Sequence, residues 1–521
     1  MNVLRSGRVR RATELHVTGL RITSTTLNVM GAALAAVSVG MVVGGFVELG
    51  STNRDTGALF LSALITFVVG AVLFGSTQPG DARARDVFAA VGWTWLMVTG
   101  FGSLPYLLGG TFDVAGIDTS GQIVNAIFES ASGFSATGST ALTDFSIPGR
   151  GTLMYRQITQ WFGGMGIVVL AIAVLPYLGV GGLDLLTAES PGPVSERLTP
   201  RVKQTAKGLW STYVVFTFAV AIALIIIPGP SVYDAIAHGF STASTGGFSP
   251  HETSIGHFDS IAVEIALVFA MIVCGTNFTL HLRAQGGDRS AYRSDAEFRG
   301  YIVMLAGCTL LVVGILWFGG GFTVGESLRV GVFNVVTLAT STGFGNATGP
   351  GSAGDFALWL PAAQMILLFL FVVGASTSST AGGIKVMRVQ VLLAHSIRSI
   401  RRSQQSRAVI PVKRGSVAVP EDIISRMAGF FVVYALLVLS GVLLLTSVGG
   451  GLRESISACV SALGNMGPAL GAAGPTANFT EAFTEPGRLV LSAYMLIGRL
   501  EFFPILLMFA APTRAARARL P

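Results

Sequence analysis

The sequence predicts an all-α polytopic membrane protein, with two leading helices followed by four repeated units. The 521 residues are 51% hydrophobic and only 12% charged, and their mean hydropathy is +0.66. This composition excludes a soluble globular protein. Apolar runs of about 20 residues, the length that crosses the hydrocarbon core of a bilayer, recur along nearly the whole chain. Between the later runs, a short polar segment rich in glycine recurs four times.

The apolar runs form two groups. Two runs follow a basic arm, residues 1–24, and are joined by a short polar link. The basic arm and the first apolar run together could suggest a secretory leader. However, the run is long and lacks a convincing cleavage site, so we expect an uncleaved helix. The later runs combine in pairs. The predicted spans are residues 27–47, 58–74, 87–108, 158–178, 209–227, 261–280, 301–318, 358–373, 423–445 and 489–511.

From about residue 87, the chain repeats a unit of spanning helix, short polar helix, glycine-containing turn and spanning helix. The short helix has about three turns, too few to span. Because such repeats decide the fold, we predict two N-terminal transmembrane helices plus four helix–pore-loop–helix repeats around a pseudo-fourfold pore axis, not inverted pairs. The predicted divisions are an arm with a two-helix extension, 1–81, and repeats at 82–190, 191–290, 291–400 and 401–521.

The basic residues predict the orientation. They gather in the N-terminal arm and at 83–85, 197–207, 283–299, 385–414 and 514–519. With one re-entrant segment in each repeat, all of these fall on one side, which the positive-inside rule makes the cytoplasm, so both termini are expected there. The net charge of +7 thus reflects topology, not nucleic-acid binding.

The opposite loops are acidic or neutral. An acidic outer rim would raise the local cation concentration, while ordinary solvated loop charge explains each residue equally well. The acidic residues concerned are Asp113, Asp118, Asp144, Asp234, Glu252, Asp259, Glu326, Asp355, Glu481 and Glu485.

The four turns suit a cation filter. Glycine beside small hydroxyl residues lets the backbone leave helical geometry and point carbonyl oxygens at an axis, where they can replace the hydration shell of a monovalent cation. The short helices would direct their partly negative carboxyl ends at the same point. A ring of carboxylates, which calcium would favour, is absent from the sequence of the turns. The predicted filter residues are Ala136, Thr137, Gly138, Thr245, Gly246, Gly247, Ser341, Thr342, Gly343, Asn465, Met466 and Gly467.

Several further stretches resemble one known family. They are residues 160–176 (QWFGGMGIVVLAIAVLP), 189–207 (ESPGPVSERLTPRVKQTAK), 275–281 (GTNFTLH), 379–389 (STAGGIKVMRV) and 498–504 (GRLEFFP). From about residue 82 to its end, the chain resembles the membrane subunit of the Trk-type potassium uptake systems, in the superfamily that includes the Ktr and plant HKT transporters. The two extra leading helices are typical of the Trk branch. The resemblance makes Gly138, Gly247, Gly343 and Gly467 the filter glycines.

The resemblance also implies an activity and partners. Plant relatives that prefer sodium carry serine at the first filter position, so Gly138 favours potassium. The expected protein is a homodimer in the prokaryotic cytoplasmic membrane, in contact with lipids, with a cytosolic regulatory subunit that binds NAD(H) or ATP/ADP. Potassium is the transported ion, held at the filter residues only, and no cofactor is expected in this chain. Passive flux and symport with protons or sodium both remain open.

A polar interruption in the third repeat is the predicted gate. It is rich in Ser, Thr and Gly, which disfavour a helix interior, and at membrane depth it must face protein or a water-filled path. The resemblance makes it a loop that obstructs the path below the filter, whereas the plainer alternative is a packing kink. Its residues are Gly374, Ala375, Ser376, Thr377, Ser378, Ser379, Thr380, Ala381, Gly382 and Gly383.

Two cationic residues accompany the interruption. Arg499 lies within an apolar run, where an arginine needs a partner or a wet cavity. An ion pair with Glu501 competes with contact to the gating loop, which the resemblance favours. Lys385, just after the loop, is expected to anchor a helix at the interface.

Other functions have less support. The histidines have no metal-ligand spacing, and the chain lacks HExxH, CxxC, Walker A and nucleophile-elbow motifs, so an enzyme is not expected. His238 is expected to make a packed polar contact. A carrier of organic solutes would predict inverted repeats and a pocket of polar side chains. The basic segment 398–414 fits either anionic lipid or a cytosolic regulator.

Overall fold

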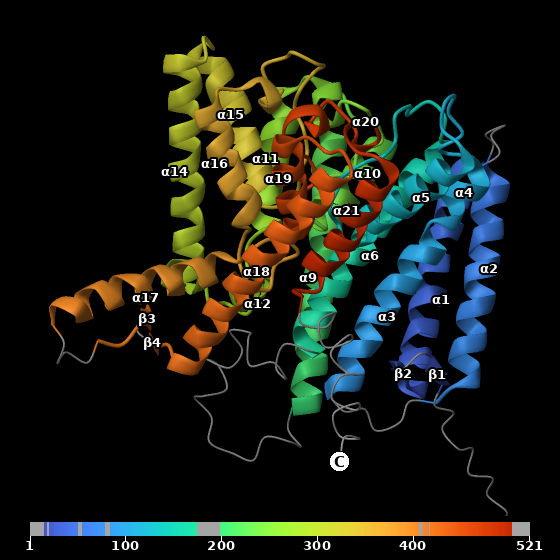
Figure 1. Cartoon of the computed structure of the whole chain (residues 1–521), viewed down its shortest axis with the longest axis horizontal. Helices are drawn as coiled ribbons and strands as arrows, with labels where there is room; N and C mark the ends of the chain where they lie inside the picture. Colours follow the sequence, from blue (N-terminus) through green and yellow to red (C-terminus); the bar gives the residue numbers. More distant parts are fainter. Residues whose placement is uncertain are drawn as a thin grey trace, which may run out of the picture.

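The computed structural model describes residues 15–17, 20–49, 55–78, 84–173, 198–405, 410–415 and 417–502. Within these ranges the regular structure is almost all helical, as predicted, and the strands form two short antiparallel hairpins. β1 (Leu15–Val17) pairs with β2 (Leu20–Ile22), and β3 (Lys413–Arg414) pairs with β4 (Val417–Ala418). Most of the long helices stand side by side, while α17 lies across one end of the bundle (Figure 1).

The predicted two-helix extension is α1 (Ser24–Glu48) and α2 (Asp55–Ser76), at one edge of the bundle (Figure 1). Two glycines let these helices approach closely. A Cβ atom on Gly70 would lie 2.9 Å from the carbonyl oxygen of Gly31, and one on Gly31 would lie 2.7 Å from that of Gly70. Membrane helices commonly associate through such small residues.

Two buried carboxylates attach the extension to the first repeat. Glu48 and Asp55 lie at the facing ends of α1 and α2, and each is only 2% exposed. They accept hydrogen bonds from the backbone amides of Gly151 and Gly149 respectively, at the start of α6. Amides in the first turn of a helix lack partners within it, so these carboxylates satisfy groups that would otherwise be buried without a hydrogen bond.

Each repeat contains a long helix, a short helix and a second helix in the expected order, and the second helix is shorter than predicted in the second and third repeats. The first has α3 (Ala84–Gly102), α4 (Leu104–Gly109), α5 (Thr119–Phe134) and α6 (Arg150–Ala173). The second has α9 (Leu198–Ile226), α10 (Val232–Ala243), α11 (Ile261–Cys274) and α12 (Phe278–Gln285). The third has α13 (Ala291–Ser294), α14 (Ala296–Gly319), α15 (Val324–Ala339), α16 (Pro361–Val372) and α17 (Val386–Gln404). The fourth has α18 (Glu421–Ser447), α19 (Leu452–Gly464), α20 (Phe479–Ala482) and α21 (Glu485–Arg499). Single 3-10 turns are η1 (Ser254–Phe258), η2 (Phe356–Leu358) and η3 (Gly471–Ala473).

The helices differ in detail from the ten predicted spans. By length and composition, five described helices could each cross a membrane, or six if the bent pair α11 and α12 counts as one span. The run 87–108 divides at Ser103 into α3 and α4, and α11 and α12 meet at 91°. α16 has only 12 residues, and α21 ends at Arg499, so the predicted continuation to 511 lies mostly outside the described residues.

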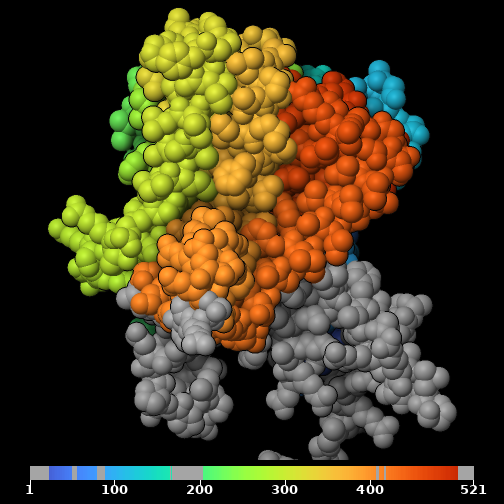
Figure 2. Space-filling view, turned by 60° about the vertical axis from the view of Figure 1, so that its left-hand side comes forward, coloured from blue at the N-terminus to red at the C-terminus, as the bar shows by residue number. Residues whose placement is uncertain are grey.

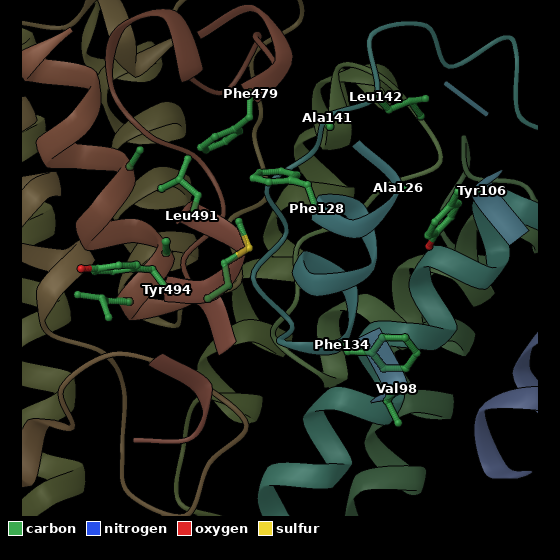
Figure 3. Close-up of a cluster of buried hydrophobic side chains, with 14 of the residues drawn as sticks. Val98, Tyr106, Ala126, Phe128, Phe134, Ala141, Leu142, Phe479, Leu491 and Tyr494 are labelled. Carbon is green, nitrogen blue, oxygen red and sulfur yellow. The ribbon is translucent and has the colours of Figure 1, made fainter. Parts of the chain in front are cut away.

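Two clusters of buried apolar side chains connect the four repeats. In one buried cluster, shown in Figure 3, side chains of the first repeat meet those of the fourth. Phe128 of α5 faces Phe479 of α20, with ring centroids 5.4 Å apart, and Leu491 and Tyr494 of α21 belong to the same cluster. A second cluster joins the second, third and fourth repeats. The first and last repeats are therefore neighbours, as an arrangement around one axis requires.

The outer faces of the long helices carry exposed apolar side chains. Figure 2 shows one such face, on which α14 stands beside α16. Leu310 and Phe318 of α14 are 74% and 80% exposed. A contiguous apolar exterior of this kind suits contact with lipid tails.

The close glycine contact in the extension gives a test of this packing. Gly70→Leu is expected to lower the thermal unfolding midpoint in detergent by several degrees, because overpacking costs about 1–3 kcal/mol. Gly75→Leu on the same helix is the matched control, since a Cβ atom at Gly75 meets nothing within 4 Å. Equal midpoints for the two variants would contradict the contact.

Candidate functional site

The short helices α5, α10, α15 and α19 all end in a turn of the same backbone geometry. The first residue of each turn has φ between 51° and 53°, and the glycine two residues later has φ between 78° and 99°. The amide of the middle residue donates to the carbonyl oxygen five residues earlier at 2.8–2.9 Å in every repeat. The four middle residues are Thr137, Gly246, Thr342 and Met466. One structure is thus built from four different sequences.

The turn glycines meet in a closed ring, which we call the glycine ring: Gly138, Gly247, Gly343 and Gly467. A Cβ atom on each of the first three would lie 2.0–2.2 Å from the middle carbonyl oxygen of the following repeat, and one on Gly467 would lie 2.9 Å from that of Thr137 in the first repeat. The contacts run from repeat one to four and back to one. All twelve residues predicted from the sequence therefore lie together, with no space for side chains at the glycines.

A cavity of about 70 Å³ opens on one side of the ring. All four ring glycines line it, together with residues that follow them in their turns, such as Ser139 and Ser249. His251 and Glu252 also line it, and His251 Nε2 lies 2.8 Å from Asp234 Oδ1. The residues that follow the ring glycines line this cavity, which we call the outer cavity. The residues before the glycines therefore lie on the opposite side of the ring.

Several of the acidic loop residues are paired or buried, so they form only part of an open acidic rim. Asp234 interacts with His251, Asp259 pairs with Arg329, and Asp355 is 5% exposed. Carboxylates also make capping hydrogen bonds at the amino ends of α5, α10 and α15, where they complement the helix dipole. Asp118 accepts from the amide of Gly121, and this bond with that of Ser120 holds the pKa of Asp118 below its usual value. The hydroxyl and amide of Thr323 lower the pKa of Glu326 in the same way.

The interruption at 374–383 lies against the other side of the ring. Thr380 Oγ1 donates to the carbonyl oxygen of Ala243 at 3.1 Å, and the amide of Gly382 donates to Ser341 Oγ at 2.6 Å. A Cβ atom on Gly382 would lie 2.1 Å from the carbonyl oxygen of Gly464. The loop therefore touches the second and fourth repeats just before their turns, and the third repeat at the first residue of its turn.

The loop is also fixed at its base. A parallel bridge joins Val373 and Ile384, so its two ends leave the bundle side by side. Glu297 of α14 accepts from the amide and the hydroxyl of Thr377 at 2.7 Å and 2.6 Å. The amide of Phe278 donates to the carbonyl oxygen of Ser378 at 3.1 Å. These bonds join the interruption to α14 and α12, so it is a folded loop.

Arg499 contacts this loop, as one of the two sequence hypotheses expects. It is 1% exposed and donates to the carbonyl oxygens of Thr380 at 2.9 Å and Gly163 at 3.1 Å. The competing ion pair with Glu501 does not form, because Glu501 pairs with Arg388.

Lys385 differs from its expected place at the interface. It is only 8% exposed and donates to the carbonyl oxygens of Ala381 and Gly382. The sequence reasoning missed this role, although the position of the lysine two residues after the pair Gly382 and Gly383 was a signal for it.

His238 makes the packed polar contact that we expected. It is buried on α10, where its ring nitrogens lie 2.8 Å from the carbonyl oxygen of Asp234 and 3.1 Å from Ser249 Oγ. In the described part of the chain, no group of three or more His, Cys, Asp or Glu side chains could hold a metal ion.

Comparison with known proteins gives one consistent result. The family model TrkH, described as a cation transport protein, matches residues 58–517. The Trk system potassium uptake protein TrkH of Halomonas elongata is 36% identical over 487 residues, covering 93% of this chain and 97% of that protein. The TrkH of Escherichia coli K12 is 34% identical over 486 residues, with coverages of 92% and 97%. The crystal structure of the potassium transporter TrkH from Vibrio parahaemolyticus matches with a TM-score of 0.82 and 31% identity, covering 93% of this chain and 97% of that one.

Proposed function

The chain belongs to the TrkH family of cation transport proteins, and from this premise we propose that it takes up potassium ions through the glycine ring. The observation that carries the proposal is the ring itself. Four turns of equal backbone geometry place their glycines against the next repeat's carbonyl oxygens, and all four glycines line one cavity. An integral membrane protein of this build offers an ion a path lined by backbone.

The chemistry of the ring suits a monovalent cation. Carbonyl oxygens from four turns can replace the hydration shell of potassium. The short helices end at the turns, so their partly negative carboxyl ends add to cation stabilisation. The carboxylates of Asp118 and Glu326 lie at the opposite, amino ends of their helices, which leaves the dipole at the ring uncompensated. The ring residues are then the ion-binding filter.

We further infer that the 374–383 loop is the gate. It lies on the far side of the filter from the outer cavity and touches three of the four repeats. Arg499 and Lys385 donate to its carbonyl oxygens, so two positive charges lie beside it. In this position the loop obstructs the path sterically and the charges oppose a passing cation.

The remaining assignments come from the family. The relatives are named as parts of the Trk system, and we propose that this chain likewise works as a homodimer in a prokaryotic cytoplasmic membrane, with a cytosolic subunit that binds NAD(H) or ATP/ADP. The ends of α12 and α17 lie at the same end of the bundle (Figure 1) and carry basic residues such as Arg283 and Arg401. That end is then cytoplasmic, on the same side of the filter as the gate.

The first prediction concerns the filter. Gly247→Ala is expected to reduce rubidium uptake into proteoliposomes at least about tenfold, because it combines strained backbone with a blocked contact. A Cβ atom there would lie 2.0 Å from the carbonyl oxygen of Thr342, at φ +83°. Gly349→Ala is the control, since nothing lies within 4 Å of its Cβ position. Uptake that is equal in both variants would refute the filter.

The second prediction concerns the gate. Arg499→Ala is expected to raise rubidium flux about tenfold or more, because it removes two charge-assisted hydrogen bonds worth about 1.5–3 kcal/mol each. Deleting loop residues 377–381 should raise flux in the same direction.

The matched control for the gate is Arg488→Ala on the same helix. Arg488 is also buried but donates to the carbonyl oxygens of Thr480 and Phe483, away from the loop. Wild-type flux through both the Arg499 variant and the deletion would show that the gate is assigned wrongly.

The third prediction concerns selectivity. In the fourth turn, Asn465 Nδ2 donates to Thr137 Oγ1 and to the carbonyl oxygen of Met495, both at 2.9 Å, so one quarter of the filter is held differently. We expect weaker discrimination against sodium than a strict fourfold filter shows. Competition of sodium and choline with rubidium uptake, with and without the cytosolic subunit, measures it. A permeability ratio equal to that of a fourfold channel would count against this expectation, and absence of selective flux would overturn the function.

A further inference from the structure

One side chain from the first repeat binds the filter turn of the second repeat. Gln160 lies on α6 and is fully buried. Its Nε2 donates to the carbonyl oxygen of Gly246 at 2.6 Å. Its Oε1 accepts from the amide of Phe248 at 3.1 Å and from Ser241 Oγ at 2.7 Å. The donor and the acceptor of one amide group are thus both used on the same turn.

These bonds bracket a ring glycine. Gly246 precedes Gly247 and Phe248 follows it, so Gln160 fixes the peptide groups on both sides of the glycine. A primary amide carries a donor and an acceptor on one group, so it can bind both peptide groups at once. The carbonyl oxygen that it binds also lies against Gly138, since a Cβ atom there would be 2.2 Å from Gly246 O. Gln160 therefore acts at the junction of the first two quarters of the ring.

The other turns are held by other groups. Ser139 Oγ donates to the carbonyl oxygen of Gly467 at 2.6 Å, and Ser341 Oγ accepts from the amide of Gly382 in the loop. Asn465 links the fourth turn to the first. The hydrogen bond of Gln160 to Gly246 is thus a separate constraint on the turn of the second repeat, made by a residue of the first repeat.

We propose that Gln160 is a positioning residue of the filter, which fixes the carbonyl of Gly246 and thereby sets the preference for potassium over sodium. The inference rests on the proposed function of the ring. Discrimination between these ions depends on the size of the carbonyl cage or on the number and stiffness of its dipoles. Freeing the carbonyl of Gly246 changes both, because the oxygen gains freedom to turn toward or away from the ion.

The test compares two buried glutamines on one helix. Gln160→Met keeps the approximate volume and removes all three hydrogen bonds. Gln157→Met is the matched control, because Gln157 is also fully buried and neither atom of its amide has a hydrogen-bond partner among the described residues. Rubidium and sodium uptake are measured in proteoliposomes that contain equal amounts of folded, monodisperse protein. A purely structural role would change the amount of folded protein, not the ratio of the two uptakes.

We expect the rubidium-to-sodium uptake ratio to fall about fivefold or more in Gln160→Met and to remain at the wild-type value in Gln157→Met. Ser241→Ala, which removes only the hydroxyl bond to Oε1, should lower the ratio by a smaller factor, about twofold. It keeps the proposal testable if Gln160→Met fails to fold.

Gly247→Ala, measured in parallel, separates the two proposals. If it abolishes rubidium uptake while the Gln160 and Ser241 variants keep the wild-type ratio, the positioning role is wrong and the filter stands. If it leaves uptake unchanged, the filter itself is wrong. An equal fall of the ratio in Gln157→Met would also overturn the role of Gln160.

Discussion

The contact between each ring glycine and the carbonyl oxygen of the next repeat is the constraint on which the rest of the structure depends. At 2.0–2.9 Å from a would-be Cβ atom, these contacts leave no tolerance for a side chain. They require all four turns to lie at the same depth, which in turn requires four short helices that end at the same point. In each repeat, the chain leaves the short helix through one residue with left-handed backbone geometry. These residues are Ala136, Thr245, Ser341 and Asn465. Such conformations are uncommon for residues other than glycine, and here one occurs at the same turn position in every repeat.

The loop in the third repeat follows from the same geometry. α16 stops at Val372, and the chain crosses toward the axis before α17 begins at Val386. Buried backbone must find partners, and the loop finds them in Glu297, Ser341 and the backbone of Gly275. Arg499 and Lys385 donate to carbonyl oxygens instead of carboxylates, so their positive charges remain beside the loop. An ion pair there would have neutralised this charge.

Much of this arrangement could be predicted from the sequence, because it follows from repetition. Four Gly-containing turns in equivalent places predict the ring, and an arginine in an apolar run predicts a buried partner. The straight span predicted over residues 261–280 misses the bend between Cys274 and Phe278, although Gly275-Thr276-Asn277 interrupts the apolar run there and Asn277 caps α12. The bonds of Gln160 depend on which distant backbone atoms face its amide group. No local pattern carries that information.

The four turns share one backbone geometry but are held by different hydrogen bonds, and this difference has a physical consequence. In a symmetric assembly of four identical chains, a loop such as 374–383 would occur four times and compete for one axis. Gly382 already lies against Gly464, so only one repeat has space to supply it. Because the repeats are joined in one chain, Ser341 can bind the loop while Gln160, Ser139 and Asn465 bind the other turns. The asymmetry of these hydrogen bonds therefore allows a single loop to lie beneath a nearly fourfold ring.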